Sequence, residues 1–572
     1  MANWRTLAVT LVAAAIVGFA AAQPPAPRPA SAAADQFAAG RAMADVRIIA
    51  RAPHPVGSPE NAAVRRYLAA RLQSLGFDVR FTAAPLPPTA RQRLLTWRTP
   101  VAADAAAISI VALRPGRDPA APAAAIMAHY DSVANSPGAA DDAAGVAAAL
   151  EIARAIPRAS QARDLVLLLT DGEEVGTVGA SGFFAADARG DPLAGRIGAL
   201  VNLETRGGGG RAFMFETGAD NGAMIDLYRR VVADPSTTSM AVKIYQLLPN
   251  STDFTPARKR GLTGFNFAFS GDARLYHSPL ATPDALEQGA LQHLGGQGLD
   301  VTRALVTAPA LPPRAADVVF GDVLGIVTIA YAPWFGWVLI AAVAAMLGFA
   351  ARARRAEWRW WGVAGGGLDA LVFTLAAGAL LYGGNLLSGA DGDPNYYDRL
   401  AALPRLEVQA LLLMAAGLGL MLAVLPRRRT LWDGWLGQAL VSLAVAIAAQ
   451  LLLPAAGAIF TWPLLLAALV MAVMARTRRF GYAIAGIAAV LGLAWIGGLA
   501  HVILLSIGAG APSAAAAFAP MTLLLLWPFV PRPRRRMAML AALALVVAAA
   551  GIASWVRLDA VAASVPPWPP RG

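Results

Sequence analysis

The sequence predicts a chain of two parts, an α/β domain followed by an all-α domain that crosses a membrane several times. Residues 37 to about 310 mix charges with short apolar runs, which is typical of a globular domain. Residues 333–556 form long apolar stretches separated by short arginine clusters. Of the 572 residues 57% are hydrophobic, and the mean hydropathy is +0.52, which is too apolar for an ordinary soluble enzyme.

The chain opens with a further apolar segment. Residues 1–22 carry an apolar run after Arg5, a pattern shared by signal anchors and signal peptides. The small residues Ala20 to Ala22 would allow cleavage, and we interpret the segment as a retained anchor, with a cleaved signal peptide as the alternative. Residues 23–36 are rich in proline and alanine and are expected to be a linker that leads away from the membrane.

The apolar second part contains eight candidate spans, each close to the ~20 residues that cross a bilayer core. Residues 311–332, which include the apolar stretch 319–331, are expected to be a linker or an interfacial segment, and residues 557–572 a C-terminal tail. With a retained anchor the chain would have nine spans. We place the eight later spans at 333–351, 363–386, 407–425, 434–454, 457–475, 482–506, 514–530 and 537–556.

The distribution of charge predicts an orientation in the membrane. The net charge is +12, and the cations are concentrated between hydrophobic segments, after the first, third, fifth and seventh spans. Cation-rich loops face the cytoplasm, so the α/β domain and the C-terminus are expected outside. This placement argues for a lipid bilayer as partner and against nucleic acid. His501 lies in the sixth span without a carboxylate near it in sequence, and we interpret it as a helix-packing residue.

Candidate metal ligands are histidines and carboxylates, because the chain has no cysteine and only five histidines. Residues 123–128 are predicted to be a buried strand, and His129 follows at its carboxyl end, the edge where open α/β sheets assemble their sites. Asp131 is expected to accept a hydrogen bond from the second imidazole nitrogen and so to fix the tautomer. Taken alone, this segment would favour an isolated surface histidine.

A pair of aspartates then precedes a run of strong helix formers, residues 143–155. A lone aspartate at this place is usually a helix N-cap. Two adjacent aspartates leave one to cap the helix and one to bind metal. We expect Asp141 to be a carboxylate that bridges two metal ions and Asp142 to be its supporting neighbour.

The next predicted strand, residues 164–170, ends just before two glutamates. Adjacent acidic side chains point in different directions, so one can bind metal while the other stays free. We assign Glu174 as a ligand and Glu173 as the general base that moves a proton during hydrolysis. In isolation the pair would equally suit two solvated loop residues.

Two more strands supply the remaining ligands. Glu204 ends the apolar run 197–203, and His277 follows the predicted strand 265–269. The first metal would take His129, Glu204 and the Asp141 bridge, and the second would take Glu174, His277 and the same bridge. Zinc suits this set of nitrogen and oxygen ligands, which manganese or cobalt would also fit.

Several of these segments resemble metallopeptidase family twenty-eight, which includes the co-catalytic zinc aminopeptidases. The resemblance rests on residues 129–132, 138–145 and 172–174, with an opening signature at 53–61. The layout of an N-terminal anchor, a lumenal peptidase domain and eight later spans resembles the endoplasmic reticulum metallopeptidase and vacuolar membrane protease subgroup. The segments 202–204, 251–254 and 276–278 fit that subgroup as well.

The resemblance implies an α/β zinc-peptidase domain over residues 37–310, with a mixed β-sheet flanked by helices and two Zn²⁺ ions. It implies hydrolysis of a peptide or protein substrate, often from the amino end. It also suggests a cis bond between Asp141 and Asp142, and a structural role for His54. Soluble relatives usually carry Asp where Glu204 stands, and the longer side chain should still reach a metal.

Other functions remain open at the level of sequence. The same domain could be a glutaminyl cyclase or a carboxypeptidase-like hydrolase, or an inactive receptor or scaffold, although an inactive site would have no reason to keep every ligand. A transporter with an accessory ectodomain is disfavoured, because the spans contain few charges and no obvious repeat. Alanine and arginine are abundant and lysine is nearly absent, which indicates a GC-rich bacterial genome and so an inner membrane with the peptidase domain in the periplasm.

Overall fold

The structure is a computed structural model in which residues 4–99, 101–185, 190–392, 396–424, 429–507 and 510–559 are described. The chain divides into two compact units. An α/β unit holds residues 23–330, and a helical unit holds the N-terminal helix together with the described residues between Tyr331 and Asp559. Each unit is described below by itself.

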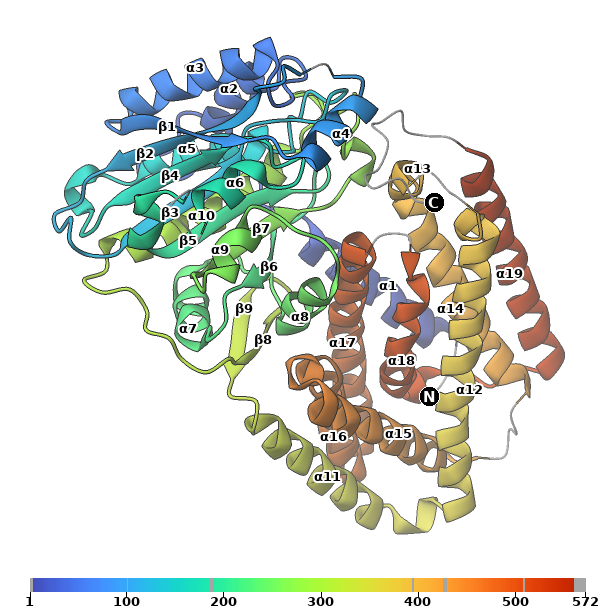
Figure 1. The fold of residues 1–572 in the computed structure, drawn as a ribbon. Coiled ribbons are helices and arrows are strands. Elements are labelled where there is room, and N and C mark those ends of the chain that lie inside the picture. The colour runs from blue at the N-terminus through green and yellow to red at the C-terminus, as the bar shows by residue number, and fades with distance from the viewer. Residues whose placement is uncertain are drawn as a thin grey trace. The chain divides into compact units, whose positions relative to one another are not determined.

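The α/β unit is built on a seven-stranded mixed sheet with the strand order β1-β2-β4-β3-β5-β7-β6 (Figure 1). The four neighbours β4, β3, β5 and β7 run parallel, while β1, β2 and β6 are antiparallel to their partners. The strands are β1 (Asp78–Pro85), β2 (Ala106–Arg114), β3 (Ala123–His129), β4 (Leu165–Thr170), β5 (Ile197–Thr205), β6 (Phe213–Thr217) and β7 (Thr263–Phe269).

The central strands are apolar along their whole length because both faces of the sheet are covered. Every residue of β3 and β4 is buried. Successive side chains point to opposite faces, so Ile126 packs into one core layer and Met127 into the other. This confirms the fold class that the sequence predicts, a mixed sheet flanked by helices.

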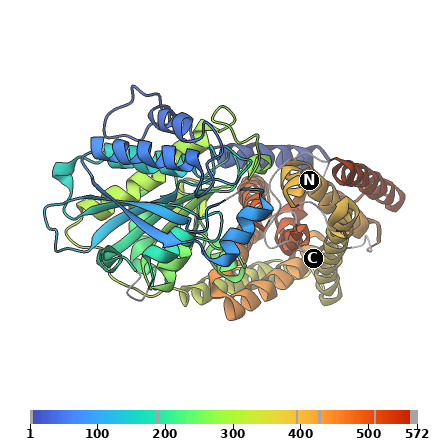
Figure 2. The ribbon, with the colours of Figure 1, turned by 45° about the horizontal axis from the view of Figure 1, so that its top comes forward.

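Helices cover both faces of this sheet (Figures 1 and 2). On one face α2 (Ala39–Ile49), α3 (Pro59–Ser74), α5 (Ala143–Ala155), α7 (Gly222–Val231) and α10 (Gln288–Thr307) share a core with the strands. On the other face lie α6 (Val178–Phe183) and α9 (Phe254–Lys259). The remaining helices of the unit are α4 (Pro88–Thr96) and α8 (Ser239–Leu247).

A separate two-stranded hairpin closes the α/β unit. It consists of β8 (Val319–Val323) and β9 (Val327–Tyr331). The turn uses Leu324 and Gly325, both with positive φ (53° and 74°), as tight hairpin turns require. The apolar stretch that was expected to be an interfacial segment is therefore a β-hairpin.

In the helical unit, nine helices among the described residues are long and apolar enough to cross a membrane, the number that the sequence predicts with a retained anchor. A short helix, α13 (Tyr396–Ala401), precedes α14. The nine are α1 (Trp4–Ala22), α11 (Phe335–Ala353), α12 (Trp360–Asn385, extended by a π-helical turn to Ala390), α14 (Leu403–Val424), α15 (Leu431–Leu452), α16 (Gly457–Arg476), α17 (Arg478–Ile507), α18 (Ala519–Leu526, with flanking 3₁₀ turns from Pro512 to Phe529) and α19 (Arg535–Leu558).

Small residues bring two of these helices close together. A Cβ atom built on Gly437 of α15 would lie 2.0 Å from the carbonyl oxygen of Val363 in α12, and one on Gly366 would lie 2.5 Å from the carbonyl oxygen of Gly434. Backbones in such contact are typical of membrane helix pairs. An ion pair between Asp369 and Arg429 (2.5 Å) lies at the same packed region.

The intramembrane histidine has a partner that its sequence neighbourhood does not reveal. His501 of α17 and Glu407 of α14 are 2.6 Å apart, from Nδ1 to Oε1. A polar pair inside two candidate spans links those helices. His501 therefore packs between helices through a charged partner 94 residues away in sequence.

Candidate metal centre

The carboxyl ends of the four parallel strands meet at one edge of the sheet, and this edge carries the predicted site. His129 is the last residue of β3, Glu204 is the penultimate residue of β5, and Glu173 and Glu174 follow β4. Gly172 has φ 71°, a conformation that favours glycine. It turns the chain after β4, so that Glu173 and Glu174 lie at the same edge of the sheet as His129. His277 comes from the loop after β7.

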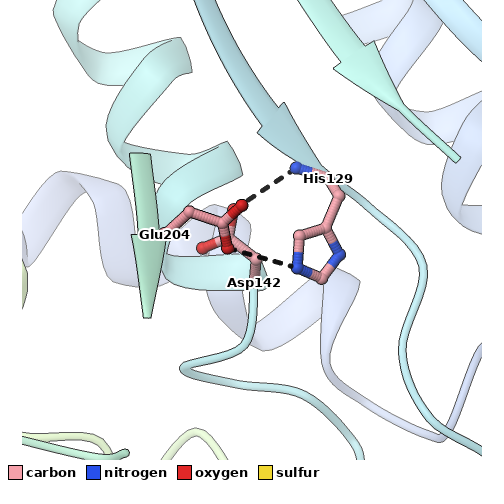
Figure 3. A group of neighbouring side chains, drawn as sticks. All are labelled: His129, Asp142 and Glu204. Atoms are coloured by element: carbon pink, nitrogen blue, oxygen red, sulfur yellow. Dashed lines mark hydrogen bonds and ion pairs between the residues drawn. The ribbon is translucent and has the colours of Figure 1, made fainter. Parts of the chain in front are cut away.

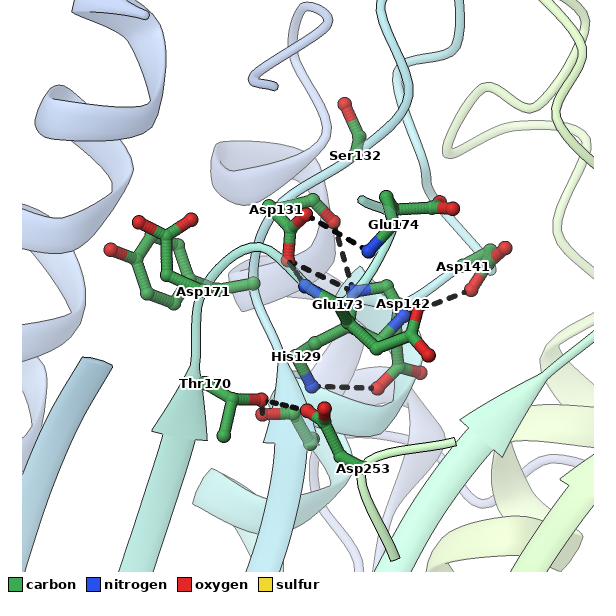
Figure 4. A network of polar contacts seen from close by, with 12 residues as sticks. His129, Asp131, Ser132, Asp141, Asp142, Thr170, Asp171, Glu173, Glu174 and Asp253 are labelled. Carbon is green, nitrogen blue, oxygen red and sulfur yellow. Dashed lines mark hydrogen bonds and ion pairs between the residues drawn. The ribbon is translucent and has the colours of Figure 1, made fainter. Parts of the chain in front are cut away.

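Asp141 lies between His129 and His277, and Figure 4 shows its contact with His129. Its Oδ1 is 3.2 Å from Nε2 of His129, and its Oδ2 is 3.3 Å from Nε2 of His277. Oε2 of Glu174 is 3.0 Å from the same nitrogen of His277. Oε2 of Glu204 is 3.7 Å from Nε2 of His129. The structure thus brings together all five side chains predicted as ligands, and each oxygen of Asp141 faces a different imidazole.

Two groups of side chains could each hold a metal ion. Asp141, Glu174 and His277 form one, with ligand atoms that all lie within 4.8 Å of one another. His129, Asp142 and Glu204 form the other by the same measure (Figure 3). In both groups all three side chains are buried, and imidazole with carboxylate is a ligand set that zinc prefers.

Asp142, however, uses both of its oxygens elsewhere. It caps α5 by accepting a hydrogen bond from the backbone N–H of Gly145 (3.0 Å) and accepts another from the backbone N–H of His129 (3.3 Å). The peptide bond between Asp141 and Asp142 is cis. Asp142 is thus the helix cap of the pair, which leaves the side chain of Asp141 directed at the histidines.

The site contains far more negative than positive charge. Around two imidazoles lie the carboxyl groups of Asp131, Asp141, Asp142, Glu173, Glu174 and Glu204, nearly all buried. Oε1 of Glu174 is buried without a hydrogen-bond partner among the described residues. Burying carboxylates without compensation is costly, and divalent cations offset that cost. The residues present therefore fit two divalent metal ions.

The surroundings shift the pKa values of the acids in opposite directions. Burial alone would raise the pKa of Asp141, but its contacts with both imidazoles outweigh this and lower the pKa to about 2. Glu173 is partly exposed, yet the surrounding protein desolvates its carboxyl group, and this raises its pKa well above the ordinary value against the opposing pull of His129. A carboxyl group with a raised pKa next to a carboxylate that stays ionised is a common arrangement for proton transfer.

Asp131 connects the ends of two strands. Its carboxylate accepts hydrogen bonds from the backbone N–H groups of Glu173 (3.0 Å) and Glu174 (3.3 Å). Nδ1 of His129 lies 3.0 Å from the carbonyl oxygen of Asp131 and 3.5 Å from its carboxylate. The closer acceptor for the imidazole is thus the main chain of Asp131, while its side chain holds the two glutamates.

His277 is held by its own neighbour. The ring of Tyr276 stacks on the imidazole, with centroids 3.8 Å apart and planes at 24°. His277 has φ 53°, a left-handed conformation that only a small fraction of non-glycine residues adopt. The loop after β7 therefore fixes the orientation of this ring.

The opening signature lies beneath the loop that follows His129. The backbone N–H of His54 donates a hydrogen bond to Oγ of Ser132 (2.9 Å). The amide of Asn61 donates to Oδ1 of Asp171 (2.9 Å), next to the glutamates. Burial lowers the pKa of His54, and its Nδ1 lies 2.9 Å from the carbonyl oxygen of Ala52. His54 thus supports the loop and stands outside both candidate metal groups.

Part of the chain matches a known protein family. Residues 109–301 match the profile of peptidase family M28. This region is a peptidase family M28 domain. It contains all seven predicted site residues, which lie between β2 and α10 in the chain.

The M28 domain is similar to parts of larger proteins. The chain is 34% identical to human "Endoplasmic reticulum metallopeptidase 1" over 238 residues, which cover 40% of this chain and 26% of that protein. It is 28% identical to the "Vacuolar membrane protease" of Eremothecium gossypii over 295 residues, 50% of this chain and 28% of that protein. The match thus spans about a quarter of the length of these relatives.

Solved structures similar to the M28 domain include the aminopeptidase from Aneurinibacillus sp. strain AM-1 (TM-score 0.37, 15% identity, 50% of this chain and 97% of that chain). The glutaminyl cyclase of Porphyromonas gingivalis is another (TM-score 0.36, 18% identity, 47% of this chain and 98% of that chain).

Behind Glu204, the M28 domain contains a buried polar chain that sequence reasoning did not find. The amide of Asn202 donates to Oε1 of Glu204 (3.3 Å) and to Oδ1 of Asn266 (2.9 Å). The amide of Asn266 donates in turn to Oε2 of Glu216 (3.0 Å), which pairs with Arg258 (2.8 Å). The available signal was a single asparagine among apolar residues in the middle of each of two strands, β5 and β7.

Proposed function

We propose that the chain is a membrane-anchored, di-zinc metallopeptidase that releases residues from the amino end of peptide or protein substrates. The position of Asp141 carries the proposal. One carboxylate with an oxygen directed at each of two histidines, and with one further carboxylate beside each histidine, is the arrangement that two metal ions with a bridging ligand require.

We assign the first ion to His129, Glu204 and Asp141, and the second to Glu174, His277 and Asp141. Bound zinc would lower the pKa of water and polarise the scissile carbonyl group. Zinc is favoured over manganese by the two imidazole ligands.

Glu173 is the group that we assign to proton transfer. The raised pKa of its carboxyl group suits a residue that takes a proton from the attacking water and passes it to the leaving amine. Asp131 would position this residue, because its carboxylate holds the backbone N–H groups of Glu173 and Glu174. A side chain with this function must remain unligated, which is why we separate Glu173 from its neighbour.

The setting of the domain is part of the proposal. The nine apolar helices support an integral membrane protein. The positive-inside rule favours a peptidase domain outside the cytoplasm. The high content of alanine and arginine favours a GC-rich bacterial genome, and we therefore propose a bacterial inner membrane with the domain in the periplasm.

The full-length protein, purified in detergent, tests this proposal. We expect about two equivalents of zinc per chain and hydrolysis of aminoacyl-nitroanilides, with loss of activity when the amine is acetylated. A cut within acetylated peptides would make the protein an endopeptidase. Release of ammonia from glutaminyl peptides without cleavage would make it a cyclase, and metal-free protein without turnover would refute the proposal.

A further inference from the structure

The β8–β9 hairpin has an unusual distribution of polar and apolar side chains. Ile326 at the turn is 76% exposed, and Val327 and Ile329 on β9 are 48% and 43% exposed. Thr328 between them is 5% exposed. A strand on a protein in water normally turns its apolar side chains inward, so β9 is inverted. Adjacent exposed apolar side chains of this kind mark a surface that is covered in the working protein.

The hairpin is firmly attached to the α/β unit. The backbone N–H of Phe320 donates to Oγ of Ser239, which donates to the carbonyl oxygen of Phe320 (3.2 and 3.1 Å). Asp322 accepts from the backbone N–H groups of Thr237 (2.9 Å) and Gly325 (2.8 Å). The exposed face is therefore part of a rigid element.

One arginine links the hairpin turn to Gln23, the first residue of the α/β unit. Nη1 of Arg211 donates to the carbonyl oxygen of Gln23 (3.3 Å), the residue that follows α1. A Cβ atom built on Gly325 would lie 2.8 Å from Nη2 of the same guanidinium group. The hairpin turn and Gln23, which directly follows α1 in the chain, thus contact the same arginine side chain.

The other end of the hairpin leads directly into a second span. β9 ends at Tyr331 and α11 begins at Phe335, so the connection reaches about 14 Å at most. Residues 323–338 contain no Asp, Glu, Lys, Arg or His. Trp334 and Trp337 at the start of α11 are 66% and 41% exposed, and tryptophan is enriched where membrane proteins meet the headgroup layer.

We propose that the face formed by Ile326, Val327 and Ile329 inserts into the boundary between lipid headgroups and acyl chains. The occupant is lipid, since β9 continues within a few residues into the candidate span α11 and the segment carries no charge that would oppose insertion. The hairpin then restricts the orientation of the α/β unit on the membrane more than its covalent connections to α1 and α11 would do alone. The inference does not depend on the catalytic proposal.

The absence of cysteine allows a direct test. Ile326→Cys, Val327→Cys and Ile329→Cys in the full-length chain are labelled with a fluorophore and reconstituted into phosphatidylcholine vesicles. Matched controls are Ile48→Cys and Phe81→Cys, which replace apolar side chains of the same unit that are 42% and 52% exposed. Two quenchers are compared, iodide in the water and bromine on the lipid acyl chains.

We expect brominated lipid to quench the three hairpin labels and iodide to quench them about threefold less than the controls, since interfacial elements lie roughly 5–10 Å into the headgroup region. Equal iodide access at hairpin and control labels, without lipid quenching, would overturn the proposal. The proposal would also be overturned if the hairpin labels were protected from iodide in detergent and this protection increased with protein concentration, because the occupant would then be a second copy of the chain. Thermal unfolding of each labelled protein confirms that it is folded.

Discussion

At the residue scale, the central feature is an excess of buried carboxyl groups around two imidazoles. Asp141 stays ionised because both histidines contact it, while burial raises the pKa of Glu173. Burial also raises the pKa of Glu204, so the assignment of roles rests on geometry: Asp141 contacts both imidazoles, whereas Glu173 is partly exposed and lies outside both candidate metal groups. A ligand must present a carboxylate at all times, whereas a proton-transfer group must be able to hold a proton.

Glu173→Gln tests this division. Glutamine keeps the shape of the side chain and the backbone N–H bond to Asp131, so we expect metal content to remain and kcat to fall by roughly 10²–10⁴-fold. The adjacent Glu174→Gln is the matched control, and it should lower metal content because it weakens a ligand. Zinc analysis and nitroanilide kinetics on both variants measure the difference. Equal metal loss in the two would show that the roles are assigned wrongly.

Asn202 gives a second residue-scale prediction. Its amide donates to Glu204, so Asn202→Asp replaces a donor with an acceptor of the same shape. We expect metal affinity to fall by about 10–100-fold, as for other residues that support metal ligands. Titration with a zinc indicator gives the affinity. Asn221→Asp, in the same unit but away from the site, is the control and should bind zinc as the wild type does.

At the element scale, the parallel strands explain why scattered residues meet. β3, β4, β5 and β7 run in the same direction, so the residues that follow their carboxyl ends share one edge. The expected strands and the helix at residues 143–155 are confirmed. The polar chain behind Glu204 could not be predicted, because the pairing of β5 with β7 places Asn202 opposite Asn266 and nothing local indicates that register.

Asp142→Asn separates the two possible roles of Asp142. Asparagine caps helices about as well as aspartate but has only one acceptor oxygen, so it can keep the bond from Gly145 and loses the bond from His129. If Asp142 acts as the cap of α5, we expect the metal content to stay unchanged and the stability to fall by less than in the alanine variant. Asp142→Ala should lower stability by about 1–2 kcal/mol. Thermal unfolding and zinc analysis are the measurements. Loss of one zinc ion in Asp142→Asn would instead make Asp142 a ligand of the ion at His129.

The contact between α12 and α15 supports a prediction for the helical unit. Gly437→Ala places a methyl group against the backbone of Val363, and we expect a loss of about 1–3 kcal/mol or more, as overpacking does elsewhere. Gly348→Ala in α11 is the control, since a Cβ atom there meets nothing within 4 Å. Thermal unfolding in detergent, followed by the fluorescence of the 14 tryptophans, compares the two. Equal stability would contradict the close contact.

At the scale of the whole molecule, His293 makes stability depend on pH. Its Nδ1 accepts from the backbone N–H of Ala212 (2.9 Å), and its Nε2 donates to the carbonyl oxygen of Asp234 (2.7 Å), which fixes a neutral ring. Burial, assisted by Arg211, lowers its pKa to about 4. Between pH ~6.5 and ~4 the unfolded chain binds a proton that the folded protein does not, so stability falls on acidification.

The expected contribution is on the order of 3 kcal/mol, present in full above pH ~6.5 and lost as the pH falls to ~4. His293→Gln should be less stable at pH 7 but show a flatter dependence over this range. The other titratable groups are the same in both proteins, so their contributions to the pH dependence of stability cancel in the comparison. Melting temperatures from pH 4 to 7 provide the measurement, and parallel curves would contradict the prediction.

The sequence by itself determined the division into a globular and an apolar part and the helix and strand types around the site, and it predicted seven candidate site residues. These features depend on local composition and periodicity, which can be recognised in the sequence of each segment. Only the tertiary structure decided that Asp142 rather than Asp141 caps α5, that the main chain of Asp131 lies nearest His129, that Glu407 meets His501, and that a hairpin turns its apolar face outward. Each of these depends on which segments pair in space. Strand register and helix packing bring together residues that are far apart in the sequence, and the local sequence around each residue does not indicate its distant partner.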